Sequence, residues 1–293
     1  MSKVSEQVRT RFRQGDDLRD AGLTTPADVL RFDDIRYGSD PIWQTLDVYR
    51  PRQAKGIQLP VIVSVHGGAW VYGDKTRYQY YCMSLAQHGF AVVNFSYRLA
   101  PEFKFPASLE DCNLVFTWVL DHAEEYGLDS ERVFAVGDSA GGHLLGLFLA
   151  LCTDPAFRKE FPFAPPPNFV PKGVALNCGY YQFTGDGDEQ TAALLADLLP
   201  QRGTQRELRQ IDVLSHVNSR FPPVFVMTST GDFLQDQALM LAKVLVQHSV
   251  PFVFHFYGDA LHCLEHVFHC NVRSPEGIRC NQDECDFFKE LIV

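Results

Sequence analysis

The chain has 293 residues, 46% of them hydrophobic and 21% charged, so it can bury a sizeable core and is not a disordered polymer. Its formal net charge of −10 argues against nucleic acid or an anionic membrane as a partner, because both attract clustered cations. No apolar run reaches the length of a membrane span, and the first residues lack the apolar centre of a secretory signal. We therefore expect a cytoplasmic protein whose eight cysteines are thiols.

The first forty residues are expected to form short helices, because Val4, Val8 and Phe12 are spaced four apart and Thr25-Pro26 resembles a helix start. Strand-like and helical runs then alternate. The expected strands are residues 61–65, 90–95, 133–136, 174–176, 224–227 and 252–257, and the expected helices include 108–126, 140–151 and 235–247. Several strands are continuously apolar, as strands covered on both faces are. The pattern predicts one α/β domain over residues 1–293, with a mostly parallel central sheet and helices on both faces.

Residues 181–219 interrupt this alternation with a helical run, 189–199, that has no strand attached. The segment is either an ordinary surface excursion or part of the site. Long segments in compact domains tend to be functional, and open α/β sheets bind ligands at the carboxyl ends of their strands. We therefore expect a small helical cap made by residues 1–40 and 180–219.

A candidate nucleophile stands in the sequence Gly137-Asp138-Ser139-Ala140-Gly141. A serine hydroxyl attacks an ester when a tight turn projects it from the backbone, and small neighbours permit such a turn. A strand-like run precedes the motif and an apolar helical run follows it, which is the strand–turn–helix context that the motif requires. We predict that Ser139 is the nucleophile.

The serine needs a base, and the base needs an orienting acid; in this fold both follow later strands, in the order serine, acid, histidine. Asp232 comes a few residues after the strand 224–227, and His262 a few residues after the strand 252–257. Asp236, His266 and His269 are rivals that lie further from their strand ends. Strand-end placement therefore favours Asp232 as the acid and His262 as the base.

The oxyanion of a tetrahedral intermediate needs hydrogen-bond donors that are fixed before reaction. One donor is expected to be the amide of Ala140, directly after the nucleophile. The others are expected from the loop His66-Gly67-Gly68-Ala69-Trp70 after the strand 61–65, where glycines let the backbone approach a substrate closely.

With these motifs the chain resembles the hormone-sensitive-lipase-like family of α/β-hydrolase esterases. The resemblance rests on HGGAW (66–70), GDSAGG (137–142), YRLAPE (97–102) and DFLQD (232–236). It implies hydrolysis of short-chain acyl esters without a cofactor, an α/β-hydrolase fold with a helical cap, and a serine and an acid that match Ser139 and Asp232.

The resemblance also implies the finer parts of the site. It maps the oxyanion amides to Gly68, Ala69 and Ala140, with Gly67 as a further candidate donor, and makes the histidine at position 66 a loop-fixing residue. Trp70 is assigned to substrate binding. Two positions depart from the family pattern: alanine replaces the usual third glycine at position 69, and cysteine replaces the usual glycine after the catalytic histidine at position 263.

Histidines and cysteines at positions 262, 263, 266, 269 and 270 have a spacing that a zinc ion can use. The later cysteines at 280 and 285 lie too far along the chain to complete a standard zinc fingerprint, and the histidine at 262 is assigned as base. We therefore expect neither a metal nor a cofactor.

The sequence thus predicts a serine carboxylesterase that hydrolyses short-chain esters, acetyl to butyryl, through an acyl-enzyme. Two alternatives stay open: an amidase or aryl formamidase with the same triad, and a non-catalytic binding protein on the same fold. The expected partner is a small-molecule ester, and a homodimer is left open.

Overall fold

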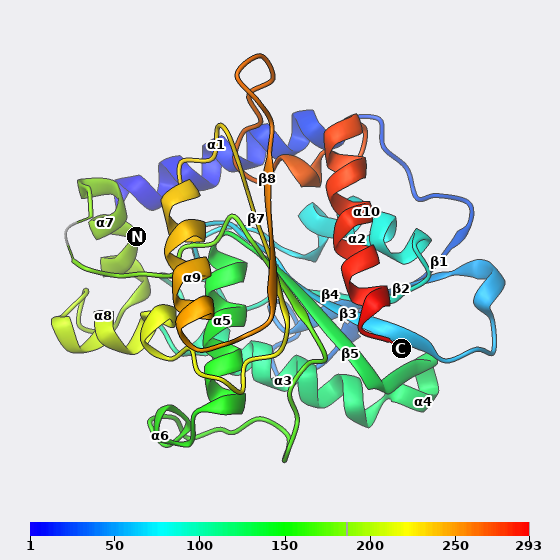
Figure 1. Cartoon of the computed structure of the whole chain (residues 1–293), viewed down its shortest axis with the longest axis horizontal. Helices are drawn as coiled ribbons and strands as arrows, with labels where there is room; N and C mark the ends of the chain where they lie inside the picture. The colour runs from blue at the N-terminus through cyan, green and yellow to red at the C-terminus, as the bar shows by residue number, and fades with distance from the viewer. Residues whose placement is uncertain (186, 293) are drawn as a thin grey trace.

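The computed structural model describes residues 1–185 and 187–292. Its centre is an eight-stranded sheet with the strand order β1-β2-β4-β3-β5-β6-β7-β8 (Figure 1). β1 pairs with β2, and β2 with β4, in antiparallel fashion, whereas β3 to β8 are parallel. The strands are β1 (Val29–Arg36), β2 (Thr45–Pro51), β3 (Leu59–Val65), β4 (Ala91–Phe95), β5 (Leu128–Asp138), β6 (Val174–Asn177), β7 (Val224–Ser229) and β8 (Phe252–Tyr257).

Helices cover both faces of this sheet, with α2 and α10 on one face and α3, α5 and α9 on the other. The α-helices are α1 (Lys3–Asp20), α2 (Lys75–Gln87), α3 (Ala107–Asp121), α4 (Ala123–Tyr126), α5 (Ala140–Thr153), α6 (Pro155–Arg158), α7 (Glu189–Leu198), α8 (Gln205–Ile211), α9 (Gln235–Gln247) and α10 (Pro275–Glu290). Three 3₁₀ turns complete the set: η1 (Arg52–Ala54), η2 (Val213–Ser215) and η3 (Phe268–Cys270). The predicted α/β-hydrolase fold is confirmed.

The central strands show why the sheet is covered twice. Along β3, Val61 and Val63 face the core that contains α3 and α5, while Ile62 faces the core that contains α2 and α10. All three side chains are fully buried. Successive strand residues point to opposite faces, and burying an apolar side chain stabilises the fold by about 1.5–3 kcal/mol, so an unbroken apolar run is stable only between two layers.

The amino-terminal prediction is partly wrong. One long helix, α1, replaces the expected series of short helices, and Thr25-Pro26 lies in an irregular segment before β1 rather than at a helix start. Residues Val29–Arg36 form the edge strand β1, which pairs along β2. Pairing with β2 makes this segment a strand, because tertiary pairing overrides local propensity in such edge segments.

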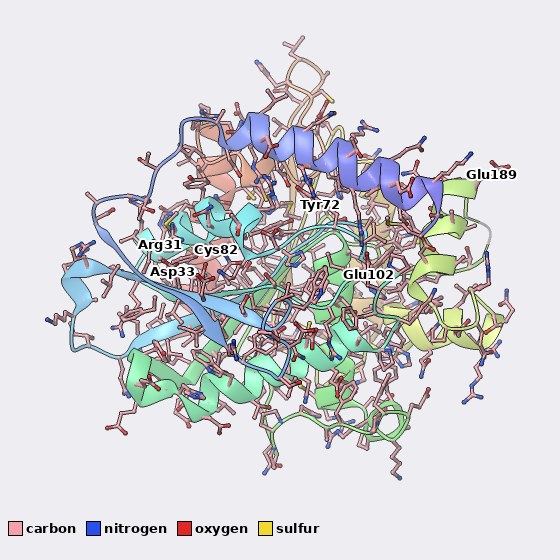
Figure 2. The ribbon with its side chains drawn as sticks, turned by 180° about the vertical axis from the view of Figure 1, so that it is seen from behind. Arg31, Asp33, Tyr72, Cys82, Glu102 and Glu189 are labelled. Carbon is pink, nitrogen blue, oxygen red and sulfur yellow. The ribbon has the colours of Figure 1, made fainter. Side chains whose placement is uncertain are left out.

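The helix α1 packs beside α7, the helical run without a strand. The Ser5 hydroxyl donates a hydrogen bond to Oδ2 of Asp197 at 2.6 Å, and the Arg9 guanidinium donates to the carbonyl of Val71 at 2.7 Å. In the view from behind, α1 crosses above Tyr72 and its amino-terminal end lies near Glu189 (Figure 2). The two segments predicted to form a cap are therefore in contact with each other, and α1 also touches the loop after β3.

Among the described residues, the helices are all too short or too polar to cross a bilayer. All eight cysteines are free thiols, as expected, and seven of them are buried.

Candidate active site

The nucleophile motif forms a sharp turn between β5 and α5. Ser139 has φ 53° and ψ −116°, a strained conformation for a residue with a side chain. The turn is tight: a Cβ at Gly141 would lie 2.0 Å from the carbonyl oxygen of Val65, and one at Gly137 would lie 2.6 Å from that of Gly141. The Ser139 amide donates to the Asn177 carbonyl on β6 at 2.9 Å, which fixes the turn against the sheet.

An aspartate and a histidine meet beyond the neighbouring strands β7 and β8. Nδ1 of His266 donates a hydrogen bond to Oδ1 of Asp232 at 2.7 Å, and the Asp232 side chain is fully buried. Oδ2 of Asp232 accepts from the Thr228 hydroxyl at 2.7 Å, and Oδ1 also accepts from the Leu234 amide at 2.9 Å. Burial alone would raise the pKa of Asp232, but these hydrogen bonds and the charge of His266 together hold the pKa below its usual value. A carboxylate is thus aimed at the imidazole.

The structure corrects the predicted base, because His262 does not reach Asp232. Nδ1 of His262 faces Oδ1 of Asp259 at 3.2 Å, and both side chains are more than 60% exposed. The Asp259 carboxylate also accepts from the amides of Leu261 and His262, so this loop forms a local side-chain-capped turn in solvent. Asp236 is exposed in the first turn of α9, as expected for the weaker candidate acid.

The histidine that meets Asp232 could not be recognised from its distance to the strand end. The loop after β8 makes its own turn before it returns to β7, where Gly231 and Glu265 form an isolated parallel bridge. Val267, which directly follows His266, has φ 52°, a left-handed conformation in which glycine is the usual residue. Because this position is valine, the sequence lacks the glycine that would have marked a left-handed residue directly after His266. One local signal was available: Asp259 precedes His262 by three residues, the spacing of a self-capped turn.

Three backbone amides beside the serine are available as donors. Within the described residues, the amides of Gly68, Ala69 and Ala140 make no hydrogen bond inside the chain. The register of β3 and β5 pairs Val65 with the glycine at position 137, so the two loops start side by side. Gly67 is different, because its amide donates to the Tyr78 hydroxyl at 2.9 Å. The suggestion that Gly67 serves as a further oxyanion donor is therefore wrong.

The loop after β3 is held in a strained shape. Gly68, Ala69 and Trp70 have successive φ values of 122°, 51° and 62°. His66 below them is fully buried, stacks on Tyr97 with ring centroids 4.0 Å apart, and donates from Nδ1 to the next carbonyl at 2.7 Å. Burial lowers the pKa of His66 to about 4, so the ring is neutral and structural. Such fixed strain keeps donors in place before reaction.

Trp70, assigned to substrate binding, is almost fully buried. Its indole N–H donates to Nδ1 of His143 at 2.9 Å, and Nε2 of His143 donates to the Ile211 carbonyl at 2.9 Å. Burial lowers the pKa of His143 to about 4, which keeps Nδ1 an acceptor. Phe183 and Tyr180 surround the pair, with ring centroids 6.0 and 6.3 Å from that of Trp70. The result is a rigid aromatic cluster beside the loop.

The histidines and cysteines at 262–270 do not converge on one point. The first histidine and the exposed cysteine beside it lie in the solvent loop, while His266 turns to Asp232 and His269 turns to Asp138. Two smaller groups bring one donor atom from each residue within 4.8 Å: Asp138, His269 and Cys270, and Cys178, Asp232 and His266. In each group an imidazole nitrogen is hydrogen-bonded to the carboxylate.

Comparisons with known proteins agree on the class of this site. Residues 46–244 match the family described as BD-FAE. Carboxylesterase NlhH of Mycobacterium tuberculosis is 29% identical over 263 residues, which cover 84% of this chain and 77% of that protein. Esterase LipC of the same organism is 34% identical over 129 residues, or 44% of this chain. The matches span only 32% of LipC and 56% of the probable carboxylic ester hydrolase LipM.

Solved structures of esterases align with nearly the whole chain. Esterase B from Lactobacillus rhamnosis, in a structure inhibited by a C4-C4 tributyrin phosphonate, is 26% identical with a TM-score of 0.89, and the alignment covers 99% of this chain and 96% of that one. An esterase from Pyrobaculum calidifontis is 23% identical with a TM-score of 0.79, covers 100% and 95% of the two chains, and so shares the fold.

Proposed function

Since the chain belongs to the BD-FAE family and has the fold of solved α/β-hydrolase esterases, we propose that it is a serine carboxylesterase with Ser139, His266 and Asp232 as its triad. The observation that carries the proposal is the Asp232–His266 hydrogen bond at the same sheet edge as the serine turn. Asn177, whose carbonyl accepts from the Ser139 amide, is followed by Cys178, and the Cys178 sulfur lies within 4.8 Å of donor atoms of both other triad members.

In the proposed mechanism, Nε2 of His266 takes the proton from Oγ of Ser139 as the oxygen attacks the ester carbonyl. Asp232 holds the proton on Nδ1 and stabilises the imidazolium that forms. The developing oxyanion is bound by the amides of Ala69 and Ala140, with that of Gly68 beside them. The imidazolium then protonates the departing alcohol, and the same base activates the water that releases the acid.

We place the acyl preference at short chains, acetyl to butyryl. The Trp70–His143 hydrogen bond and the rings of Phe183 and Tyr180 support this, because a rigid aromatic cluster beside the loop leaves little freedom for a long acyl chain. The family has glycine where this chain has Ala69, and the added methyl group takes up space in the loop after β3. Esterase B, which is similar to this chain, is inhibited by a C4-C4 tributyrin phosphonate and by a C6-C4 inhibitor, and the C4 groups are within the proposed range.

The test combines labelling with a substrate series. A fluorophosphonate is expected to label the wild-type protein once, at Ser139, and to leave Ser139→Ala unlabelled. With p-nitrophenyl esters from acetate to laurate, kcat/KM is expected to peak at or below butyrate. Absence of labelling together with absence of turnover would overturn the esterase in favour of a binding protein, and a maximum at laurate would overturn the short-chain preference.

Ester and anilide substrates with the same acyl group separate the esterase from an amidase. The ester is expected to be the better substrate by kcat/KM. An anilide or aryl formamide that is hydrolysed faster than its matched ester would make the protein an amidase with the same triad.

A further inference from the structure

A second histidine–carboxylate pair lies behind the proposed site, fully out of solvent. Nε2 of His269 donates to Oδ1 of Asp138 at 3.0 Å, and both side chains are at most 1% exposed. The same oxygen accepts from Nδ2 of Asn177 at 3.1 Å, and that amide also contacts Oε1 of Glu284 at 3.0 Å. The Tyr81 hydroxyl donates to the other Glu284 oxygen at 2.8 Å. We refer to these five residues as the buried network.

The network draws its members from parts of the chain that are far apart in sequence. Asp138 ends β5 and Asn177 ends β6, while Tyr81 lies on α2 and Glu284 on α10. His269 lies in the turn η3, between β8 and α10. The network therefore joins the central sheet to the helical layer on one of its faces, at the edge where the serine turn is built.

The electrostatic environment of the network favours a protonated His269. Burial alone would lower the pKa of His269, but the negative charge of Asp138 and the hydrogen bond between them raise it well above its usual value. Burial and the charge of Asp138 raise the pKa of Glu284 to about 7 against the opposing effect of His269. A buried ion pair adds little net stability, but leaving one partner alone is costly, so such pairs fix geometry.

Each member of the pair is close in sequence to one of the two groups whose separation matters most for the reaction. Asp138 directly precedes Ser139, and Asn177 also accepts the Ser139 amide through its carbonyl. His269 follows the base His266 by three residues, and the turn between them passes through the strained Val267. A left-handed valine persists only where surrounding contacts over-determine the backbone, and the His269 anchor is such a contact.

We propose that the Asp138–His269 pair is a positioning device that sets the place of the base His266 relative to the nucleophile Ser139. The inference rests on the proposed esterase function. Asp138 and His269 touch no substrate in this account; they act through the residues on either side. Loss of the pair would let the turn after His266 drift, and a shift of about 1 Å at a reacting group can cost about 10²-fold in rate.

The test uses His269→Gln and Asp138→Asn, each of which keeps the size and a hydrogen-bonding group but removes one charge. Asp47→Asn serves as the matched control, because the buried Asp47 carboxylate on β2 forms an ion pair with Lys75 at 2.6 Å, and the strands β4 and β3 separate β2 from β5 and the buried network. For each protein we would measure kcat and KM on p-nitrophenyl butyrate, the fluorophosphonate labelling rate, and the midpoint of unfolding.

Both single variants are expected to lose about 10- to 100-fold in kcat with KM changed less than about threefold, because the reacting groups and not the substrate contacts are displaced. The double variant Asp138→Asn with His269→Gln restores a neutral hydrogen-bonded pair and is expected to recover at least about tenfold of that loss. Asp47→Asn is expected to lower the unfolding midpoint without changing kcat.

A spectroscopic readout separates positioning from general destabilisation. The low-field proton resonance of the His266–Asp232 hydrogen bond is expected to shift or broaden in both single variants and to stay unchanged in Asp47→Asn. Should His269→Gln fail to fold, the isosteric Asp138→Asn carries the same test.

The inference is overturned if both single variants retain the kcat of the wild type, or if they lose no more activity than the Asp47 control. It is also overturned if the loss appears in KM alone. These outcomes differ from a failure of the proposed function, in which the wild-type protein itself is neither labelled nor active.

Discussion

Two histidine–aspartate pairs have their histidines, His262 and His266, only four residues apart in the segment after β8, yet their surroundings differ. His262 and Asp259 are 3.2 Å apart with 70% and 64% of their side chains exposed, whereas His266 and Asp232 are 2.7 Å apart with 16% and 0% exposed. The first pair closes a turn within one loop. The second joins loops that follow two different strands.

The contrast shows that a histidine and an aspartate in contact do not by themselves form a preorganised acid–base pair. Their burial and their other hydrogen bonds decide this. In solvent, an ion pair contributes about 0–1 kcal/mol and fixes little, because water competes for both partners. Beside the sheet edge, Asp232 has its oxygens held by Thr228 and Leu234, so only one direction is left for the imidazole. A preorganised carboxylate fixes the tautomer of the base, and a flexible one does not.

The largest expected effect separates the two histidines. His266→Ala should lower kcat for p-nitrophenyl butyrate by at least about 10³-fold, because the serine loses its base. His262→Ala should stay within about twofold of the wild type, as exposed substitutions usually do. Steady-state kinetics on both variants decide the matter, and equal losses would end the distinction between the pairs.

The aspartates allow the same comparison with a smaller change. Asp232→Asn keeps the shape of the side chain but removes the charge that supports the imidazolium, and kcat should fall by at least about 10²-fold. Asp259→Asn should leave kcat unchanged. A pH–rate profile is the sharper measurement, since the ascending limb reports the base: it should move in Asp232→Asn and stay in place in Asp259→Asn.

The buried network extends the comparison to stability. Burial holds the pKa of Glu284 at about 7, above the ordinary value of 4.5, so the folded protein keeps a proton that the unfolded chain has released between these pH values. The contribution of Glu284 to the free energy of unfolding is therefore largest below pH 4.5. It falls as the pH rises through 7, by about 3 kcal/mol in all.

His269, with its raised pKa, has the same sign: its contribution is present below pH 6.5 and is lost as pH rises through the higher folded value. Urea unfolding at pH 5, 6, 7 and 8 measures this loss. Glu284→Gln should flatten the curve, while Glu276→Gln, a change in the first turn of the same helix, should not. A wild-type stability that rises across this range would contradict the assignment.

The smallest expected effect concerns the turn after the base. The left-handed φ of 52° at Val267 costs about 1–2 kcal/mol in a residue with a side chain. Val267→Gly relieves this strain, but glycine also adds flexibility to the unfolded chain. The net change in unfolding free energy should stay within about 1 kcal/mol. Ser249→Gly, at φ 54° after α9, is the control. A large loss of kcat in Val267→Gly alone would show that the valine itself holds His266.

Much of the architecture was readable from the chain. Continuous apolar runs predicted the buried parallel strands, and the strand–turn–helix context around Ser139 predicted the sharp turn and the free amide after it. The carboxylate that meets the imidazole could also be expected from the sequence, because Asp232 stands directly past the end of β7. These are local consequences of periodicity and of small residues, which operate over a few positions in sequence.

What only the tertiary structure decided was the assignment of partners across space. The edge strand Val29–Arg36 needed β2 beside it to be recognised, and the Gly67 amide was lost as a donor because the Tyr78 hydroxyl, on a helix eleven residues away, accepts it. His266 and not His262 meets Asp232, because the loop after β8 first closes on itself and then returns to β7. Sequence fixes which groups a segment carries, but their burial and their neighbours, which set their chemistry, arise only when distant segments pack together.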